Sequence, residues 1–219
     1  MSFLDQEKVV EIEKKLTSDP SFLGKLYKSK KSEYFTIRVD HSLVEDYLKE
    51  GWVEFTKPDK NKTILRKLKP HSRKFEDDVW CQFYELGFRK MNYDDKFFLP
   101  FSNNNGETKQ IDVVAINDEI AFIVECKSSE QLKKAPSFKD EFELLGLRID
   151  GFKKSLQQIY GRDFKIKHVF ATRNIRIDPD GEDMRRFEST KSFYYNNNTY
   201  NYINSLIKNY KNAAVYQFL

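Results

Sequence analysis

Residues 109–127 read KQIDVVAINDEIAFIVECK and contain two short runs rich in strand-forming residues. The runs at 113–116 and 120–124 are apolar at successive positions, which is typical of strands that are buried on both faces of a covered sheet. The polar residues at 117–118 predict a turn that joins the two strands. Asp112, Glu125 and Lys127 adjoin these runs, and a buried strand needs none of their charges. Their position predicts a functional site.

Strand geometry predicts that the three charged side chains converge. Successive side chains of a strand alternate between faces, so Glu125 and Lys127 share one face while Cys126 points to the other. Pairing of the two strands brings Asp112 alongside them. Two carboxylates suit Mg²⁺ or Mn²⁺, which can activate water and stabilise charge on a phosphate, and a lysine can orient the water or offset negative charge. The simpler alternative is a salt bridge between Glu125 and Lys127 at a strand end.

The order of Asp112, a spacer and Glu125-Cys126-Lys127 resembles the signature of the PD-(D/E)xK nuclease superfamily, which has the restriction-endonuclease-like fold. The resemblance implies a metal-dependent phosphodiesterase in which Asp112 and Glu125 are metal ligands and the Cys126 carbonyl is a further ligand. It also implies that Lys127 is the catalytic lysine. Ile111 stands where the family name has proline, a loosely kept position of that motif.

Two helices expected from the sequence also resemble features of the PD-(D/E)xK superfamily. Residues 75–86 carry an apolar helical stripe that ends before Gly87 and predict the first core helix. Many members of the superfamily place a glutamate on this helix near the metal, and Glu76 is the matching residue. The alternatives are its acidic neighbours at 77–78, or an acidic first turn that only complements the helix dipole. Apolar residues spaced by four and three predict a long helix at 138–159, whose Gln157 loosely resembles a glutamine that some subfamilies place beside the metal.

The order of elements predicts an α/β protein with two parts. Residues 1–73 form an N-terminal α/β extension, with helices expected at 4–16, 22–27 and 42–49 and strands at 34–39 and 52–55. Residues 74–219 form a restriction-endonuclease-like domain, a mixed sheet flanked by helices. Besides the hairpin, this domain has strands expected at 96–101 and 165–172, a polar loop at 128–137, a helix at 200–210 and a strand at 213–219.

The composition fits a globular protein, with 39% hydrophobic and 33% charged residues among 219. The longest wholly apolar run, 120–124, is far too short to span a membrane, and the N-terminal MSFLDQEKVVEIEKK has no apolar signal segment. We therefore expect a cytoplasmic protein with no membrane partner. Cys81 and Cys126 are too few for a disulfide framework, and no Cys/His spacing indicates a zinc site.

Basic residues concentrate at 57–74, where eight Lys or Arg face one acid, Asp59. Such a run neutralises phosphates independently of sequence, so we predict nucleic-acid contacts by Lys67, Lys69 and Arg73. The alternative is a solvated edge strand or linker that lysines keep soluble. Arg173 and Arg176 follow the expected strand at 165–172 and are further candidates for phosphate contacts.

The function predicted from these patterns is Mg²⁺- or Mn²⁺-dependent hydrolysis of DNA phosphodiester bonds by an endonuclease. The alternative is a nuclease-like domain that binds nucleic acid or partner proteins without cleaving. The segments GWVEF, KPH and FEDDVW also resemble the nuclease-like N-terminal region of DGQHR-domain proteins, a group linked to DNA modification or phage defence, although the DGQHR motif itself is absent. This context implies restriction or defence and further domains in a longer chain. The sequence does not decide whether RNA is the substrate instead of DNA, or whether the protein forms a homodimer.

Overall fold

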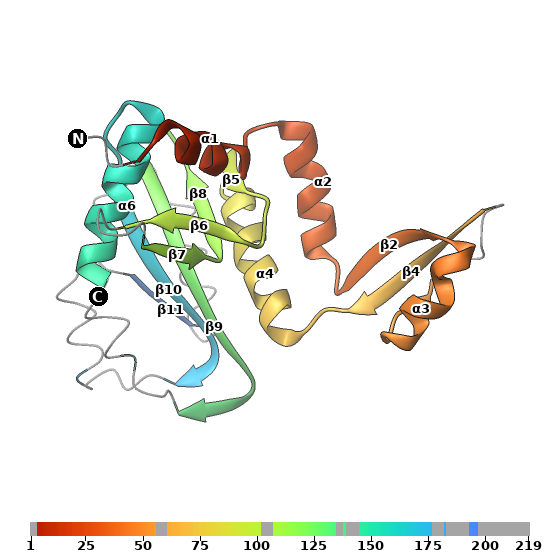
Figure 1. Cartoon of the computed structure of the whole chain (residues 1–219). Coiled ribbons are helices and arrows are strands. Elements are labelled where there is room, and N and C mark those ends of the chain that lie inside the picture. Colours follow the sequence, from red (N-terminus) through yellow and green to blue (C-terminus); the bar gives the residue numbers. More distant parts are fainter. Residues whose placement is uncertain are drawn as a thin grey trace.

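A six-stranded mixed sheet forms the centre of the protein in a computed structural model. The structure describes residues 4–55, 61–101, 107–134, 138, 145–176, 182 and 193–196. At 145–147, 176 and 193–196 it describes the backbone alone. The strand order is β1-β5-β8-β9-β10-β11 (Figure 1). Strands β1, β5, β8 and β9 pair antiparallel, and β9, β10 and β11 pair parallel. Their bounds are Leu16–Thr17, Lys90–Asn92, Val113–Ile116, Ile120–Lys134, Lys165–Arg176 and Phe193–Asn196.

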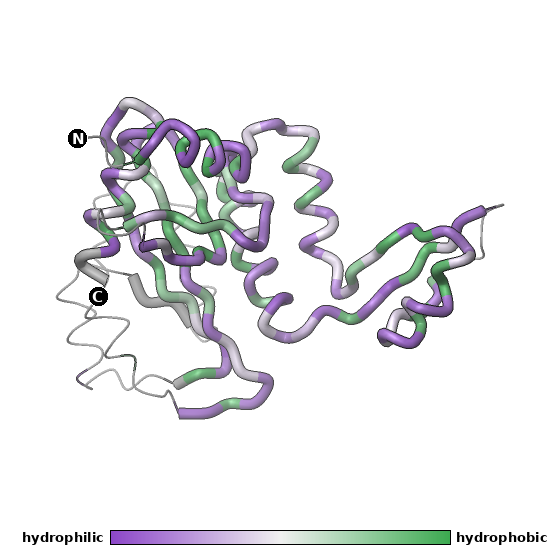
Figure 2. Tube along the Cα trace, in the orientation of Figure 1, coloured by the Kyte–Doolittle hydropathy of each residue, from purple (hydrophilic) through white to green (hydrophobic). Residues whose placement is uncertain are grey.

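Helices cover both faces of this sheet. On one face α1 (Gln6–Lys14) and α6 (Leu145–Tyr160) pack against Val114 and Ile123. On the other face α2 (Pro20–Lys31) and α4 (His71–Glu85) pack against Val113, Val124 and their neighbours. Figure 2 shows hydrophobic residues through the central strands. The two apolar strands of the hairpin are therefore buried on both sides, and the prediction of an α/β protein with a mixed sheet flanked by helices is confirmed.

The register of the hairpin is the one that the candidate site requires. Val113 lies opposite Val124, and Ile116 lies opposite Ala121. A second, two-stranded sheet of β6 (Phe97–Pro100) and β7 (Thr108–Ile111) precedes it. Helix α6 crosses this pair so closely that a Cβ on Gly151 would lie 2.0 Å from the carbonyl oxygen of Phe101.

The predicted loop at 128–137 is wrong for residues 128–134, because β9 continues to Lys134. Beyond a register shift between Arg173 and Ile175, β10 still pairs with β9, and Arg176 lies opposite Lys134. Asn174 takes a left-handed conformation with φ of 57° at this shift. Backbone pairing with an adjacent strand does not require apolar side chains, so the polar composition of this segment did not reveal it.

The described part of the predicted long helix is α6. Helix α6 begins at Leu145, residues 139–144 lie outside the described part of the chain, and Phe138 is not helical but packs its ring 4.8 Å from that of Phe170. The expected helix at 200–210 and strand at 213–219 also lie outside the described residues.

The N-terminal residues do not form one separate extension that ends at residue 73, as the sequence predicted. Strand β1 joins the central sheet, the Leu4 amide donates to Gln158 of α6 at 2.6 Å, and α2 packs on α4. Residues 34–55 and 61–68 project from the body (Figure 1), and we call them the arm. The arm holds a three-stranded sheet and a short helix, with bounds β2 (Tyr34–Asp40), α3 (Val44–Lys49), β3 (Val53–Glu54) and β4 (Lys62–Leu68). In the described part of the chain, no helix is long and apolar enough to cross a membrane.

Candidate functional site

Asp112 lies at the bend between β7 and β8, where the chain passes from one sheet to the other. The hairpin register pairs Val113 with Val124, and the Asp112 amide donates to the Val124 carbonyl at 3.2 Å. Asp112 Oδ2 accepts a hydrogen bond from the Cys126 amide at 2.7 Å. Burial raises the pKa of Asp112, and the charge of Glu125 adds to the rise, although the Cys126 amide and Lys127 oppose it. The structure thus brings Asp112 to the Glu125-Cys126-Lys127 segment.

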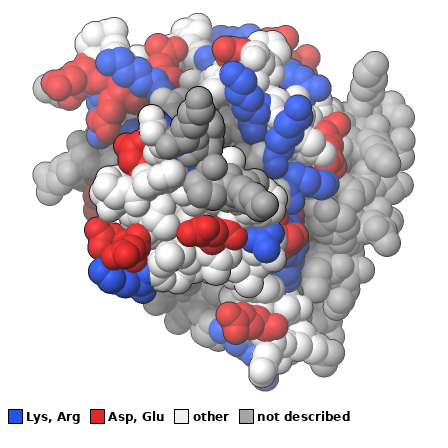
Figure 3. Space-filling view, turned by 90° about the vertical axis from the view of Figure 1, so that its right-hand side faces the viewer, with Lys and Arg blue, Asp and Glu red and all other residues white. Residues whose placement is uncertain are grey.

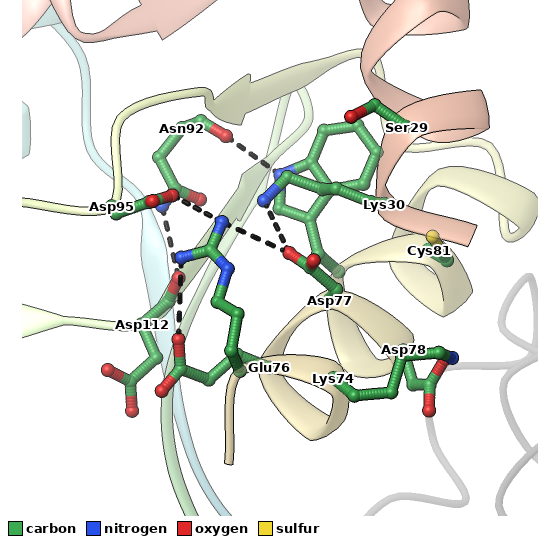
Figure 4. A network of polar contacts seen from close by, with 12 residues as sticks. Ser29, Lys30, Lys74, Glu76, Asp77, Asp78, Cys81, Asn92, Asp95 and Asp112 are labelled. Carbon is green, nitrogen blue, oxygen red and sulfur yellow. Dashed lines mark hydrogen bonds and ion pairs between the residues drawn. The ribbon is translucent and has the colours of Figure 1, made fainter. Parts of the chain in front are cut away.

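Glu76 approaches the same place from α4. Figure 4 shows its side chain beside that of Asp112. Burial and the charge of Asp112 raise the pKa of Glu76 to about 7, although Arg73, whose Nη1 lies 3.6 Å from Glu76 Oε2, lowers it in part. Two carboxylates from different elements therefore repel each other in a partly buried setting, which a divalent cation would relieve.

Glu125 has a different environment. Its buried carboxylate lies 3.2 Å from Lys109 Nζ and 3.5 Å from both Arg148 Nη1 and His168 Nε2. Burial alone would raise the pKa of Glu125, but His168, Lys109 and Arg148 outweigh burial and lower it to about 2. Sequence patterns missed these three partners of Glu125. A histidine in a strand next to the hairpin was a usable signal, since His168 lies opposite Ile123 and shares the face of Glu125.

The side chains of Lys127 and Cys126 lie on opposite faces of β9, as strand alternation predicts. Lys127 lies two residues beyond Glu125 on β9, is partly exposed, and is near enough to lower the pKa of Asp112. The Cys126 side chain packs with the core on the α4 side, where burial raises the pKa of its thiol well above the usual range. Its partly buried side chain therefore lies on the α4 side, and its backbone amide is the group directed toward the Asp112 carboxylate.

The predicted phosphate contact by Lys69 is wrong, because its ammonium is buried. Lys69 Nζ lies 2.8 Å from Asp77 Oδ2, and Arg73 Nη2 lies 3.2 Å from Asp77 Oδ1. Lys30 Nζ also lies 2.8 Å from Asp77 Oδ1, and Figure 4 shows this contact. Arg73 also pairs with Asp95. This cluster ties the end of the arm to α2 and α4, so its cations balance the Asp77 charge inside the protein.

The other basic candidates are more accessible. Lys67 lies on the arm and donates to the Glu50 carbonyl at 2.6 Å, while Arg173 is partly exposed and lies 2.9 Å from Asp78. The side chain of Arg176 lies outside the described residues. The alternative interpretation of this run as an edge strand is wrong, because β4 is the middle strand of the arm sheet, with β2 and β3 on its two sides.

Gln157 lies away from the carboxylates. It is exposed near the end of α6, whereas Arg148 near the start of this helix contacts Glu125. Nine residues separate the two positions, or about 13 Å along the helix axis. The predicted role of Gln157 beside the metal is therefore not compatible with the fold, and Arg148 is the residue that α6 contributes.

Two residues of the site supply oxygen donors that suit a hard cation. Asp112 and Glu76 supply carboxylate oxygens whose mutual repulsion a cation would remove, and the Cys126 peptide adjoins them. Glu125 would join them only by exchanging its cationic partners. Within the ranges that the structure describes, no three or more His, Cys, Asp or Glu side chains gather in a metal-holding arrangement.

Comparisons with known proteins identify no family for this chain. No protein-family model matches the chain, and no curated protein matches it. Among solved structures, protein VC1899 from Vibrio cholerae matches with a TM-score of 0.42 and 12% identity over 94% of this chain and 53% of that chain. The chain therefore spans about half the length of VC1899. The protein is an α/β protein with a mixed sheet flanked by helices.

Proposed function

We propose that the protein is a metal-dependent phosphodiesterase of the restriction-endonuclease-like class that hydrolyses nucleic acid, with DNA as the first candidate. One observation carries the proposal: the carboxylates of Asp112 and Glu76, from two distant segments, face each other next to the Cys126 peptide and within the electrostatic reach of Lys127. The order of α4, β8, β9, α6 and β10 also agrees with the fold that the sequence resemblance implies.

Each residue of the site has its own role in the proposed reaction. Asp112 and Glu76 would hold Mg²⁺ or Mn²⁺, with the Cys126 carbonyl as a further oxygen ligand. When bound, such a metal activates water and stabilises the charge of the phosphate that is displaced. Lys127 orients the attacking water or offsets negative charge on the phosphate in the transition state. Glu125 holds Lys109 and Arg148 near the site and so adds positive charge beside the path of a phosphate.

A second candidate is a nuclease-like module that binds nucleic acid or a partner protein without cleaving. The cationic surroundings of Glu125 favour it, because three basic side chains already satisfy this carboxylate. A metal would have to compete with them, and breaking a buried pair is costly.

Plasmid nicking with Mg²⁺ or Mn²⁺ separates the two candidates. The wild type is expected to nick or linearise the plasmid, and Asp112→Asn is expected to abolish cleavage while retaining binding of DNA without metal, because it removes a ligand that repels phosphate. The control is Asp118→Asn, in the turn between β8 and β9, where the side chain is 96% exposed. If the wild type cleaves neither DNA nor RNA and metal does not shift its melting, the non-cleaving module replaces the enzyme.

A further inference from the structure

The arm has one buried and one open sheet face. Residues 39, 63 and 65 point to one side and are buried, and α3 lies on that side because Lys67 of the same face contacts the Glu50 carbonyl just after α3. On the opposite face no described residue is buried. Strand register assigns to this open face the side chains of Tyr34, Thr36, Arg38, Asp40, Val53, Phe55, Lys62, Ile64, Arg66 and Leu68.

Aromatic rings and an arginine form a row across the open face. The guanidinium carbon of Arg66 lies 4.6 Å from the centre of the Tyr34 ring and 4.9 Å from that of Phe55. Phe55 is 54% exposed and Tyr34 36% exposed. The Arg66 Nε atom is buried with no hydrogen-bond partner among the described residues, so the rings rather than hydrogen bonds to Nε hold this part of the guanidinium. The row presents flat groups from β2, from β4 and from the residue that follows β3.

Charge is separated between the two sides of the arm. The open face carries three cations, Arg38, Lys62 and Arg66, against one acid, Asp40. The α3 side carries four described acids against two lysines, namely Glu45, Asp46, Glu50 and Glu54 against Lys49 and Lys67. Basic and acidic side chains are interspersed over the side of the molecule from which the arm projects (Figure 3). The open face is therefore marked by net positive charge together with exposed rings, and not by a large basic patch.

We propose that the open face of the arm binds a single-stranded nucleic acid, with bases stacked on Phe55, Tyr34 and Arg66 and phosphates near Arg38. Bases are available for stacking on a sheet only when the strand is unpaired, and aromatic rings and arginine planes are the groups on which they stack. The net positive charge complements a phosphate backbone, whereas the acidic α3 side would repel it. The inference rests on the proposed function, to which it adds a preference for unpaired strands as the substrate.

The position of the arm agrees with this role. Strand β4 is followed by α4 after a two-residue link, and the second turn of α4 carries Glu76. Lys69 in this link is held by Asp77, which fixes the base of the arm to the helix that supplies the candidate ligand. A nucleic-acid strand bound on the open face of the arm would therefore be held next to the helix that carries Glu76.

Fluorescence anisotropy with the full chain tests the proposal. The probes are labelled oligothymidylate and oligouridylate of about 20 nucleotides and a duplex of the same length, in EDTA so that no cleavage occurs. Phe55→Ala and Tyr34→Ala are each expected to weaken binding of the single strands by roughly 5- to 150-fold, which corresponds to the loss of one stacked base. Arg66→Lys keeps the charge but loses the planar group and is also expected to weaken binding. The matched control is Leu48→Ala on α3, which is 41% exposed and should bind as the wild type does.

Several results would overturn the inference. Wild-type affinity in both aromatic variants, an equal loss in Leu48→Ala, or tighter binding of the duplex than of the single strands would each do so. Sedimentation provides a further outcome: a wild-type dimer that Phe55→Ala converts to a monomer would make a second copy the occupant of this face. Because binding in EDTA and metal-dependent cleavage are separate readouts, a protein that binds single strands through Phe55 but never cleaves refutes the enzyme and leaves the arm inference intact.

Discussion

Replacing Glu76 by glutamine is expected to stabilise the protein at alkaline pH and to weaken its response to metal. The pKa of Glu76 is about 7 in the folded protein, compared with 4.5 for the ordinary glutamate, so folding favours the protonated form. The stabilisation from this preference is complete below the unfolded pKa of 4.5 and is lost as the pH rises to about 7. Above that pH the ionised carboxylate destabilises the fold through burial and the Asp112 charge.

The magnitude follows from the size of the pKa difference. A rise from 4.5 to about 7 corresponds to about 3 kcal/mol as an upper bound. The Glu76 side chain is 30% exposed, and solvent screening reduces this figure to about 1–2 kcal/mol. Glu76→Gln keeps the shape and removes the charge, so its melting temperature at about pH 8 should exceed that of the wild type by roughly 2–8 °C. At about pH 4.5 the two melting temperatures should nearly coincide.

Thermal melts at both pH values, each with and without Mn²⁺, check this prediction. At alkaline pH, Mn²⁺ should raise the melting temperature of the wild type more than that of Glu76→Gln, because a bound cation stabilises the folded state and needs the lost ligand. Glu45→Gln on the exposed surface of α3 is the matched control and should show neither effect. A stability difference that is the same at both pH values, or a metal response that the variant retains in full, refutes the reasoning.

Three further predictions concern packing and chemistry. Asp77→Asn leaves the buried Lys30 and Lys69 without their anion and should lower the free energy of unfolding by about 3–5 kcal/mol in urea titrations. The exposed Asp46→Asn should change it by less than about 0.5 kcal/mol, and equal values would contradict the cluster. Gly151→Ala should destabilise by about 1–3 kcal/mol because its Cβ meets backbone, while Gly24→Ala, whose Cβ lies 3.8 Å from the nearest atom, should not. Lys127→Ala should retain the metal-induced rise in melting temperature but slow cleavage by about 100-fold or more; loss of the metal response would make Lys127 structural.

Much of the central sheet could be predicted from the sequence because its signals are local. The runs at 113–116 and 120–124 and the helical stripe of α4 are each determined by which side chains must leave water, and the structure has them as predicted. The alternation of β9 also separated Lys127 from Cys126 correctly. The nearness of Glu76 to Asp112 came from a family resemblance and not from periodicity.

Tertiary structure decided the features that depend on distant partners. Strand β1 is two residues long and exists because β5 pairs with it, and the polar end of β9 is a strand because β10 runs beside it. The sequence presents Lys69 as one more lysine in a basic run, and only the fold places Asp77 against it. The sequence by itself therefore determined the buried hairpin, whose residues carry their own apolar pattern. The partners of each charge were decided by the fold, because an ionisable side chain has no preferred neighbour until packing removes its water and leaves a particular counter-charge within reach.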